Sequence, residues 1–211
     1  LTENQLDHMD FLKLTLMPFD DEQLIKFISA WFTDDKSKIG LINEHLVSNA
    51  NISKIIRTPL LATILCVLAE SNVPLPTSEL SLYKERLKLL LGHYDVHKGI
   101  RRQESHNDIL EVIARKIAFS FHSSEKRMAT IDAIIGISIG ALSMKYEKTA
   151  IETAVNELCD PCNILIPMST NGEWGFGHLR YQEHLVAEEL IRNRWVEIEP
   201  YLTSSWWRSV L

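Results

Sequence analysis

Several kinds of absence limit what this chain of 211 residues can be. It has only three cysteines, an odd and low number that builds no disulfide framework and suits a reducing compartment. No apolar run approaches the roughly 20 residues of a membrane-spanning helix, and no signal-peptide pattern follows Leu1. We therefore expect a cytoplasmic protein with no membrane partner.

An excess of basic residues is also missing. Asp and Glu number 28 against 22 Lys and Arg, which gives a net charge of −6. This negative net charge does not favour nonspecific binding to nucleic acid or to an acidic membrane surface. The 45% hydrophobic and 24% charged content is typical of a globular chain rather than a disordered one. Because the first residue is Leu1 rather than Met, we expect a piece of a longer protein.

Motifs that would carry chemistry are absent as well. The sequence contains no Gly-x-x-x-x-Gly-Lys-[Ser/Thr] phosphate loop and no Gly-x-Ser-x-Gly nucleophile elbow. His93 and His97 are four residues apart but lack the glutamate of a zinc-protease motif, so no metal site is predicted. Cys159 and Cys162 have the spacing of a redox pair or half a zinc site, and their role stays open. We predict no enzyme activity and no catalytic residue in this segment.

What the first half does contain is helical periodicity. Apolar residues recur at helical spacing over residues 20–32, 38–46, 60–70 and 78–91. Thr58 suits an N-cap, and Pro59 suits the first position of a helix, where its missing N–H is no loss. The third of these helices is apolar almost all round, so we expect it in the middle of a helical bundle.

The second half adds a short sheet to helices. Ser105 to Asp108 reads as a capping box for a helix reaching Phe121, and helices are predicted over 130–143 and 149–159. An apolar strand at 164–170 then meets Asn171-Gly172, the dipeptide of a two-residue hairpin turn, before a long helix from Leu179. The predicted fold is mainly α, a helical bundle followed by a winged-helix domain with one small β-hairpin.

His178 lies between the last predicted strand and the long helix that follows it. Free backbone N–H groups and the positive end of the helix dipole gather at such a junction, which suits a phosphate. A neutral imidazole adds one donor. The plainer interpretation is that His178 only caps the helix or packs against Tyr181.

The residues from Phe176 to Ala187 read Phe-Gly-His-Leu-Arg-Tyr-Gln-Glu-His-Leu-Val-Ala. This string resembles the Phe-x-His-x-x-x-Gln-Glu-x-x-x-Ala signature that closes the winged-helix domain of NACHT-type NTPases, signal-transduction ATPases of the STAND class. In that family the histidine contacts the β-phosphate of ADP and locks the closed state, and the resemblance implies this role for His178. The chain departs from the family at His184, usually an aromatic residue, and at Arg180-Tyr181, often Thr-Phe.

Three upstream segments extend the resemblance in the same order as in the family. Leu16-Met-Pro-Phe19 is similar to the Leu-x-Pro-Phe segment leading out of the nucleotide-binding core, and Leu80-Ser-Leu-Tyr83 to a Leu-Tyr helix. Thr58-Pro-Leu-Leu61 is similar to the motif whose proline lies against adenine, which implies that Pro59 makes this contact. The implied cofactor is ADP or ATP in the full-length protein, and none is expected in the fragment alone.

The resemblance also implies the domain plan. Residues 1–19 would be the tail of a missing nucleotide-binding core, 20–98 the helical domain, 99–194 the winged-helix domain and 195–211 the start of a C-terminal helical superstructure. The implied partners are the upstream core and downstream sensor repeats of the same chain, with oligomerisation on activation. The implied function is an ADP-locked switch of a parent ATPase, as in prokaryotic antiviral defence. Its trigger and effector stay open. We also expect exposed side chains at Trp206 and Trp207 that begin a further helix.

Two alternatives compete with this interpretation. A winged-helix nucleic-acid-binding module would read bases with residues 149–160, a segment that carries three acidic residues and no Lys or Arg. A HEPN-like ribonuclease would use Arg115 and His122, whose spacing in one helix that family tolerates. The plainer interpretation of this pair is a solvated arginine and a histidine at a helix end.

Overall fold

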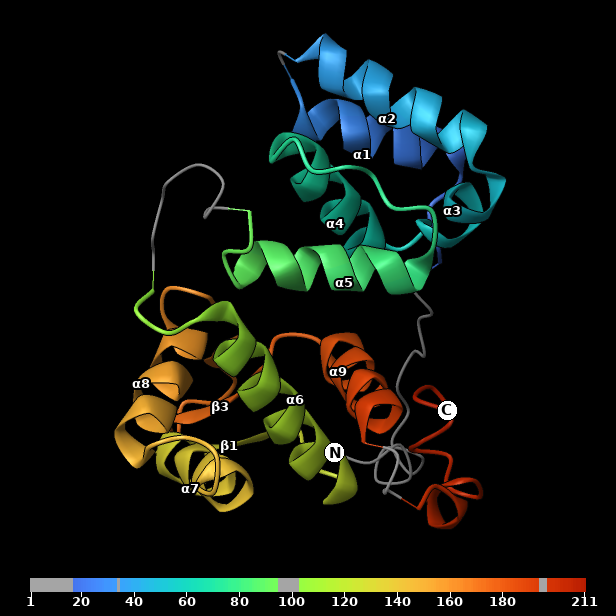
Figure 1. The fold of residues 1–211 in the computed structure, drawn as a ribbon. Helices are drawn as coiled ribbons and strands as arrows, with labels where there is room; N and C mark the ends of the chain where they lie inside the picture. The colour runs from blue at the N-terminus through green and yellow to red at the C-terminus, as the bar shows by residue number, and fades with distance from the viewer. Residues whose placement is uncertain (1–16, 34, 95–102, 194–196) are drawn as a thin grey trace. The chain divides into compact units, whose positions relative to one another are not determined.

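The computed structural model describes residues 17–33, 35–94, 103–193 and 197–211. It divides into two compact units, residues 1–75 and 76–211, and each is described by itself (Figure 1). The strand expected near residues 11–17 and most of the linker expected at 93–102 lie outside the described residues. The helix near residues 78–91 belongs to the second unit, whereas the predicted boundary at 98/99 falls in a segment that is not described.

Helices make up most of the described part of the first unit. It contains α1 (Asp21–Trp31), α2 (Lys36–Ser48), α3 (Ala50–Ile55) and α4 (Pro59–Glu70). As the apolar sequence of α4 predicts, this helix is the most buried of the four and packs against α1 and α2. The six-residue α3 has no side-chain cap, which explains why no sequence signal predicts it.

Local capping signals fix where α1 begins. The Asp20 carboxylate accepts the Gln23 N–H at 2.8 Å, and the Gln23 side chain accepts the Asp20 N–H at 3.1 Å. This is a capping box, and it satisfies two donors that the first turn of a helix leaves without partners.

The second unit carries the small sheet. Its elements in chain order are α5 (Glu79–Leu90), α6 (Asn107–Ser123), β1 (Met128–Thr130), α7 (Ile131–Leu142), α8 (Lys148–Cys159), β2 (Leu165–Pro167), β3 (Glu173–Phe176), α9 (Leu179–Arg192) and the 3-10 turn η3 (Glu199–Tyr201). The central helix α6 packs against α7, α8 and α9 (Figure 1). The predicted class, mainly α with a small antiparallel sheet, is confirmed, and the order from α6 to β3 is that of a winged helix. In the part of the chain that is described, no helix is both long enough and apolar enough to cross a membrane.

The sheet has one strand more than the sequence indicates. β3 lies between β1 and β2 and pairs antiparallel with both, with Met128 opposite Gly175 and Leu165 opposite Phe176. Because β1 has only three residues, it is too short to show an alternation of its own.

The predicted two-residue turn between β2 and β3 is wrong. The Met168 N–H donates to the Glu173 carbonyl at 2.8 Å, so four residues form the loop. Gly172 takes φ +76°, but Asn171 is not among the described residues with positive φ. The Ser169 hydroxyl donates to the Glu173 carboxylate at 3.0 Å and accepts the Asn171 N–H at 3.3 Å, which stabilises the wider loop.

The start of α6 also differs from the prediction. His106, rather than Ser105, is the N-cap, and its Nδ1 accepts the Asp108 N–H at 3.4 Å. The backbone N–H groups of Glu104 and Ser105 donate instead to the carboxylate of the buried Glu157 on α8, at 2.5 and 3.1 Å. This contact ties the beginning of α6 to α8.

The C-terminal segment covers α6 instead of presenting exposed tryptophans. Residues 197–211 form η3 followed by turns, so the helix expected at Trp206 is absent from this described stretch. Trp207 is 3% exposed and its ring stacks on Tyr201 at 3.9 Å. The Trp206 Nε1–H donates at 3.0 Å to the His122 carbonyl at the end of α6, which also accepts the Glu125 N–H at 3.1 Å.

Candidate functional site

His178 is the N-cap of α9. The residue has extended backbone angles, φ −142° and ψ 140°, and follows directly on Gly177 after β3 ends. Its Nδ1 accepts the backbone N–H of Arg180 at 3.2 Å, while the side chain stays exposed to solvent. His178 is therefore a helix cap, and this cap uses only one of the two ring nitrogens.

The cap determines which ring nitrogen carries the proton. Because Nδ1 accepts a hydrogen bond, the neutral imidazole holds its hydrogen on Nε2. Burial of part of the ring, and then the positive charges of Arg127 and Arg180, lower the pKa of His178 below 6.5, and Glu183 opposes them. At neutral pH the residue is thus an uncharged donor with one available Nε2–H.

Two arginines make the surroundings of His178 positive. Arg180 follows it on α9, and its Nη1 lies 3.1 Å from the Glu183 carboxylate. Arg127 precedes β1, and the register of β1 on β3 sets it across from Phe176, at the end of the strand that leads to His178. No sequence signal points to Arg127, because its proximity to His178 depends on the unpredicted strand β1.

The Gln-Glu pair of the α9 motif is buried and holds the helix in place. The Gln182 amide donates to the Lys126 carbonyl at 3.1 Å and lies 3.4 Å from Nδ1 of His122. Glu183, 7% exposed, accepts hydrogen bonds from Arg180 and from the Ser209 hydroxyl. These contacts join α9 to the end of α6 and to the C-terminal segment, and so fix the direction of the His178 cap.

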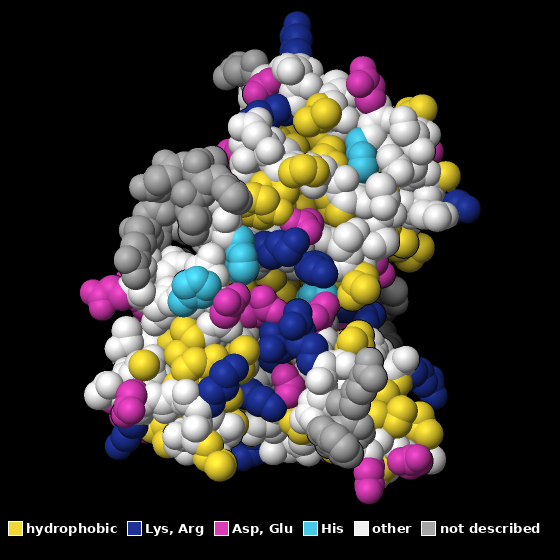
Figure 2. Space-filling view, viewed as in Figure 1, with side chains coloured by type: hydrophobic (Ala, Val, Ile, Leu, Met, Phe, Trp, Pro, Cys, Tyr) yellow, Lys and Arg dark blue, Asp and Glu magenta, His cyan; other side chains and the backbone are white. Residues whose placement is uncertain are grey.

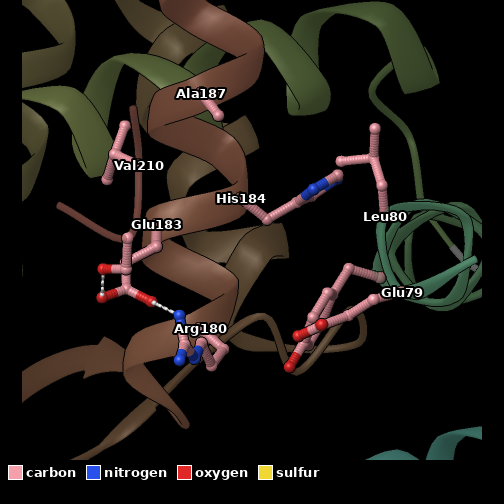
Figure 3. Close-up of a pocket in the computed structure, with 9 residues that line it drawn as sticks. Glu79, Leu80, Arg180, Glu183, His184, Ala187 and Val210 are labelled. Atoms are coloured by element: carbon pink, nitrogen blue, oxygen red, sulfur yellow. Dashed lines mark hydrogen bonds and ion pairs between the residues drawn. The ribbon is translucent and has the colours of Figure 1, made fainter. Parts of the chain in front are cut away.

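A cleft of about 350 Å³ opens beside the first half of α9. Glu79 and Leu80 reach it from α5, and Arg180, Glu183 and His184 from α9, with the Arg180–Glu183 ion pair at its edge (Figure 3). Arg180 therefore lines this cleft while its charge also acts on His178.

Pro59 occupies the first position of α4, as predicted. Thr58 is the N-cap, and its hydroxyl accepts the Leu61 N–H at 3.4 Å. The turn before it is held to α1, because the Phe19 N–H donates to the Arg57 carbonyl at 2.6 Å and Arg57 pairs with Asp21 at 2.5 Å. Pro59 is exposed. It lies in the first unit and His178 in the second, so a nucleotide shared between them stays a prediction.

The Arg115–His122 pair of the ribonuclease alternative is not solvated. Arg115 is 6% exposed, with Nη1 at 2.6 Å from Glu111 and Nε at 3.3 Å from Glu189. His122 is fully buried, and its ring stacks on Trp206 at 4.8 Å. The expectation of a solvated arginine is wrong, and this burial weighs against a role for either residue in RNA cleavage.

The helix that would read DNA in a winged helix is poor in basic residues. It begins at Lys148, one residue earlier than predicted, and this lysine lies 3.8 Å from the Glu152 carboxylate. Glu157 points inward to its two backbone donors. On the face drawn in Figure 2, basic and acidic side chains are intermixed. These features weigh against a nucleic-acid interface.

No disulfide joins the two cysteines of the Cys-x-x-Cys sequence. Burial raises the pKa of Cys159 to about 11, so this thiol is protonated at neutral pH and a poor nucleophile. Cys162 is 1% exposed. Among the described residues, no group of three or more His, Cys, Asp or Glu side chains is placed to hold a metal ion.

Comparison with known proteins gives no family assignment. No protein-family model matches the chain, and neither a curated protein nor a solved structure matches it. The function proposed below therefore depends on the residues of this chain and on the motif resemblance.

Proposed function

We propose that the chain is the regulatory segment of a NACHT-type STAND signal-transduction ATPase. Its helical and winged-helix parts would close over ADP bound to a nucleotide-binding core of the same parent protein. In this proposal His178 contacts the β-phosphate and Pro59 the adenine, and the segment performs no chemistry of its own.

The exposed His178 ring at the start of α9 carries the proposal. Its Nδ1 is occupied by the Arg180 N–H, so Nε2–H is the donor available to a phosphate oxygen. Arg127 and Arg180 add positive charge around it. An anion at this position also benefits from the positive end of the helix dipole.

The buried contacts of Gln182 and Glu183 would couple a phosphate bound at His178 to movement of neighbouring elements. Since Gln182 and Glu183 join α9 to α6 and to the C-terminal segment, a displacement of His178 moves these elements together. ADP would favour the closed arrangement and ATP the open one. A nucleotide shifts such an equilibrium only by its difference in affinity for the two states, typically about 1–3 kcal/mol.

The affinity of the full-length parent for ADP tests the phosphate end of the proposal. His178→Asn keeps a good N-cap but loses the imidazole donor, so helix α9 should persist. We expect the Kd for ADP to rise about tenfold or more, the loss of a hydrogen bond to a charged group. His106→Asn is the matched control because His106 is also an exposed histidine N-cap, at the start of α6. An unchanged Kd in His178→Asn would remove this residue from the site.

The adenine end is tested by Pro59→Ala. Alanine is tolerated at the first position of a helix, and the Thr58 cap remains. The variant should weaken ADP and AMP by the same factor, because both contain adenine. If both nucleotides bind the variant as they bind the wild type, Pro59 makes no contact with the base.

A further inference from the structure

A second, more enclosed cavity of about 140 Å³ lies between α5, α6 and α9. Its floor is apolar and is formed by Leu87, Leu91 and Leu185. Four basic side chains and only two carboxylates surround this floor. The volume has room for about five water molecules, or for a small organic molecule in their place.

The basic side chains around this cavity are not all neutralised by carboxylates. Arg115 is bound by Glu111 and Glu189, and Lys88 by Glu85 at 2.9 Å. Arg192 is 54% exposed and lies 3.4 Å from both carboxylates of the cavity, Glu111 and Glu188. Lys84 is exposed and has no ion-pair partner among the described residues. In the described part of the chain, the cation without a carboxylate partner therefore lies on the α5 side, at Lys84, and Arg192 faces it from α9 as an exposed guanidinium that shares its ion pairs with the cavity wall.

His184 adds a buried polar group at the same cavity. The residue is 7% exposed, and its Nδ1 is sealed from solvent without a hydrogen-bond partner in the described structure. The ring extends from α9 toward α5 (Figure 3) and lies 6.0 Å from the Tyr83 ring, between this cavity and the larger cleft. An N–H donor left unsatisfied in such a place would cost free energy, so the hydrogen belongs on Nε2.

The charge state of His184 agrees with this tautomer. Burial lowers the pKa of His184, Lys84 lowers it further, and Glu188 and Glu111 oppose them. The imidazole is therefore neutral at physiological pH and offers a hydrogen-bond donor rather than a charge.

We propose that this cavity binds a small organic carboxylate. Lys84 and Arg192 hold the carboxylate group, His184 donates a hydrogen bond from Nε2, and a short apolar body covers the leucine floor. The site goes beyond the proposed nucleotide contact. Glu188, which lines it, is ten residues beyond His178, or about 15 Å along α9.

Occupancy of this site would join α5 to α9. Leu87 and Lys84 belong to α5, and His184 and Arg192 to α9, so a ligand that contacts all four binds the folded unit and not the unfolded chain. Such a ligand raises the unfolding temperature as its concentration passes its Kd.

Titration of the 211-residue chain with butyrate, at constant ionic strength, tests the proposal. The readouts are the unfolding temperature and the ¹⁵N resonances of the His184 ring, with the exposed His106 as internal reference. We expect butyrate to bind about tenfold more tightly than acetate, because it buries two more methylene groups. Butanol, which lacks the charge, and inorganic phosphate, which lacks the apolar body, should bind more weakly than butyrate. Equal responses to butyrate and butanol, or tighter binding of phosphate, would overturn the proposal.

A lysine variant separates this site from general anion effects. Lys84 is exposed, so Lys84→Gln should leave the unfolding temperature of the free chain unchanged while weakening butyrate about tenfold. Lys148→Gln on α8 is the matched control and should bind butyrate as the wild type does. Equal affinity in Lys84→Gln and Lys148→Gln contradicts the proposal, as does a failure of the wild type to bind butyrate. ADP binding by the parent does not enter either result, so the two proposals fail independently.

Discussion

The substitution Gly175→Ala tests how β3 is held in the sheet that leads to His178. A Cβ at this position would lie 2.1 Å from the carbonyl oxygen of Arg127 and 3.2 Å from Cγ of Met168. Since real Cβ contacts stay above 3.0 Å, the strand and the Arg127 carbonyl must separate by about 0.9 Å. The obstacle is the backbone of the residue just before β1, and it cannot rotate away as a side chain would.

The expected cost follows from this geometry. Overpacking typically destabilises by about 1–3 kcal/mol, and the backbone contact places Gly175→Ala at about 3 kcal/mol or more. For a chain of this size we expect the unfolding temperature to fall by roughly 6–12 °C. Calorimetry measures this shift. Displacement of Arg127 should also raise the pKa of His178, because its positive charge is among the causes that lower that pKa.

A second glycine provides the control. Gly136 lies within α7, and a Cβ added there would meet no atom within 4 Å, so Gly136→Ala should stabilise the protein by about 0.4–1 kcal/mol. Replacing glycine by alanine is thus expected to lower the stability of the protein at position 175 and to raise it at position 136. A Gly175→Ala variant as stable as the wild type would refute the close approach of β3 to Arg127.

Three further substitutions test the packing behind the candidate site. Gln182→Leu removes the bond to the Lys126 carbonyl and should lower the free energy of unfolding by about 1–3 kcal/mol in denaturant titration, whereas no change would mean that this bond is not formed in solution. Trp207→Ala empties a site that is 3% exposed and should cost about 3–5 kcal/mol, with loss of protection from hydrogen exchange in residues 197–211; retained protection would contradict the packing of that segment. Burial lowers the pKa of His122, so the unfolded chain binds a proton that the folded chain does not: stability is full above about pH 6.5 and falls as the pH drops below it. The variant His122→Asn should therefore show a shallower loss of stability between about pH 7 and pH 5 than the wild type, and an equal slope would exclude His122 as a source of it.

Local signals account for what the sequence predicts correctly. The helices predicted to begin near Asp20, Thr58, Ser78 and Thr130 all form, because each of these side chains caps its helix through a backbone N–H only three residues away. The position of His178 at the start of α9 was predictable for the same reason. The strand pattern before His178 gives way to a helical pattern within a few residues, so the sequence alone locates this junction.

Contacts between distant segments account for what the sequence does not predict. The three residues of β1 form a strand only by pairing with β3, and this pairing brings Arg127 close to His178. The sequence alone predicts an exposed Trp207 near the end of the chain, but its side chain is buried against Phe119 of α6. The cavity lined by Lys84 and Arg192 likewise joins residues from three helices, and these residues form no sequence motif.

The affinities of the full-length parent for ADP and AMP, with and without the His178 imidazole, test the central claim most directly. The two nucleotides differ in the β-phosphate, the group that His178 is proposed to contact. We predict that His178→Asn weakens ADP about tenfold or more and leaves AMP unchanged, so that the preference for ADP falls by that factor. Equal weakening of both nucleotides, or none, would contradict a contact between His178 and the β-phosphate.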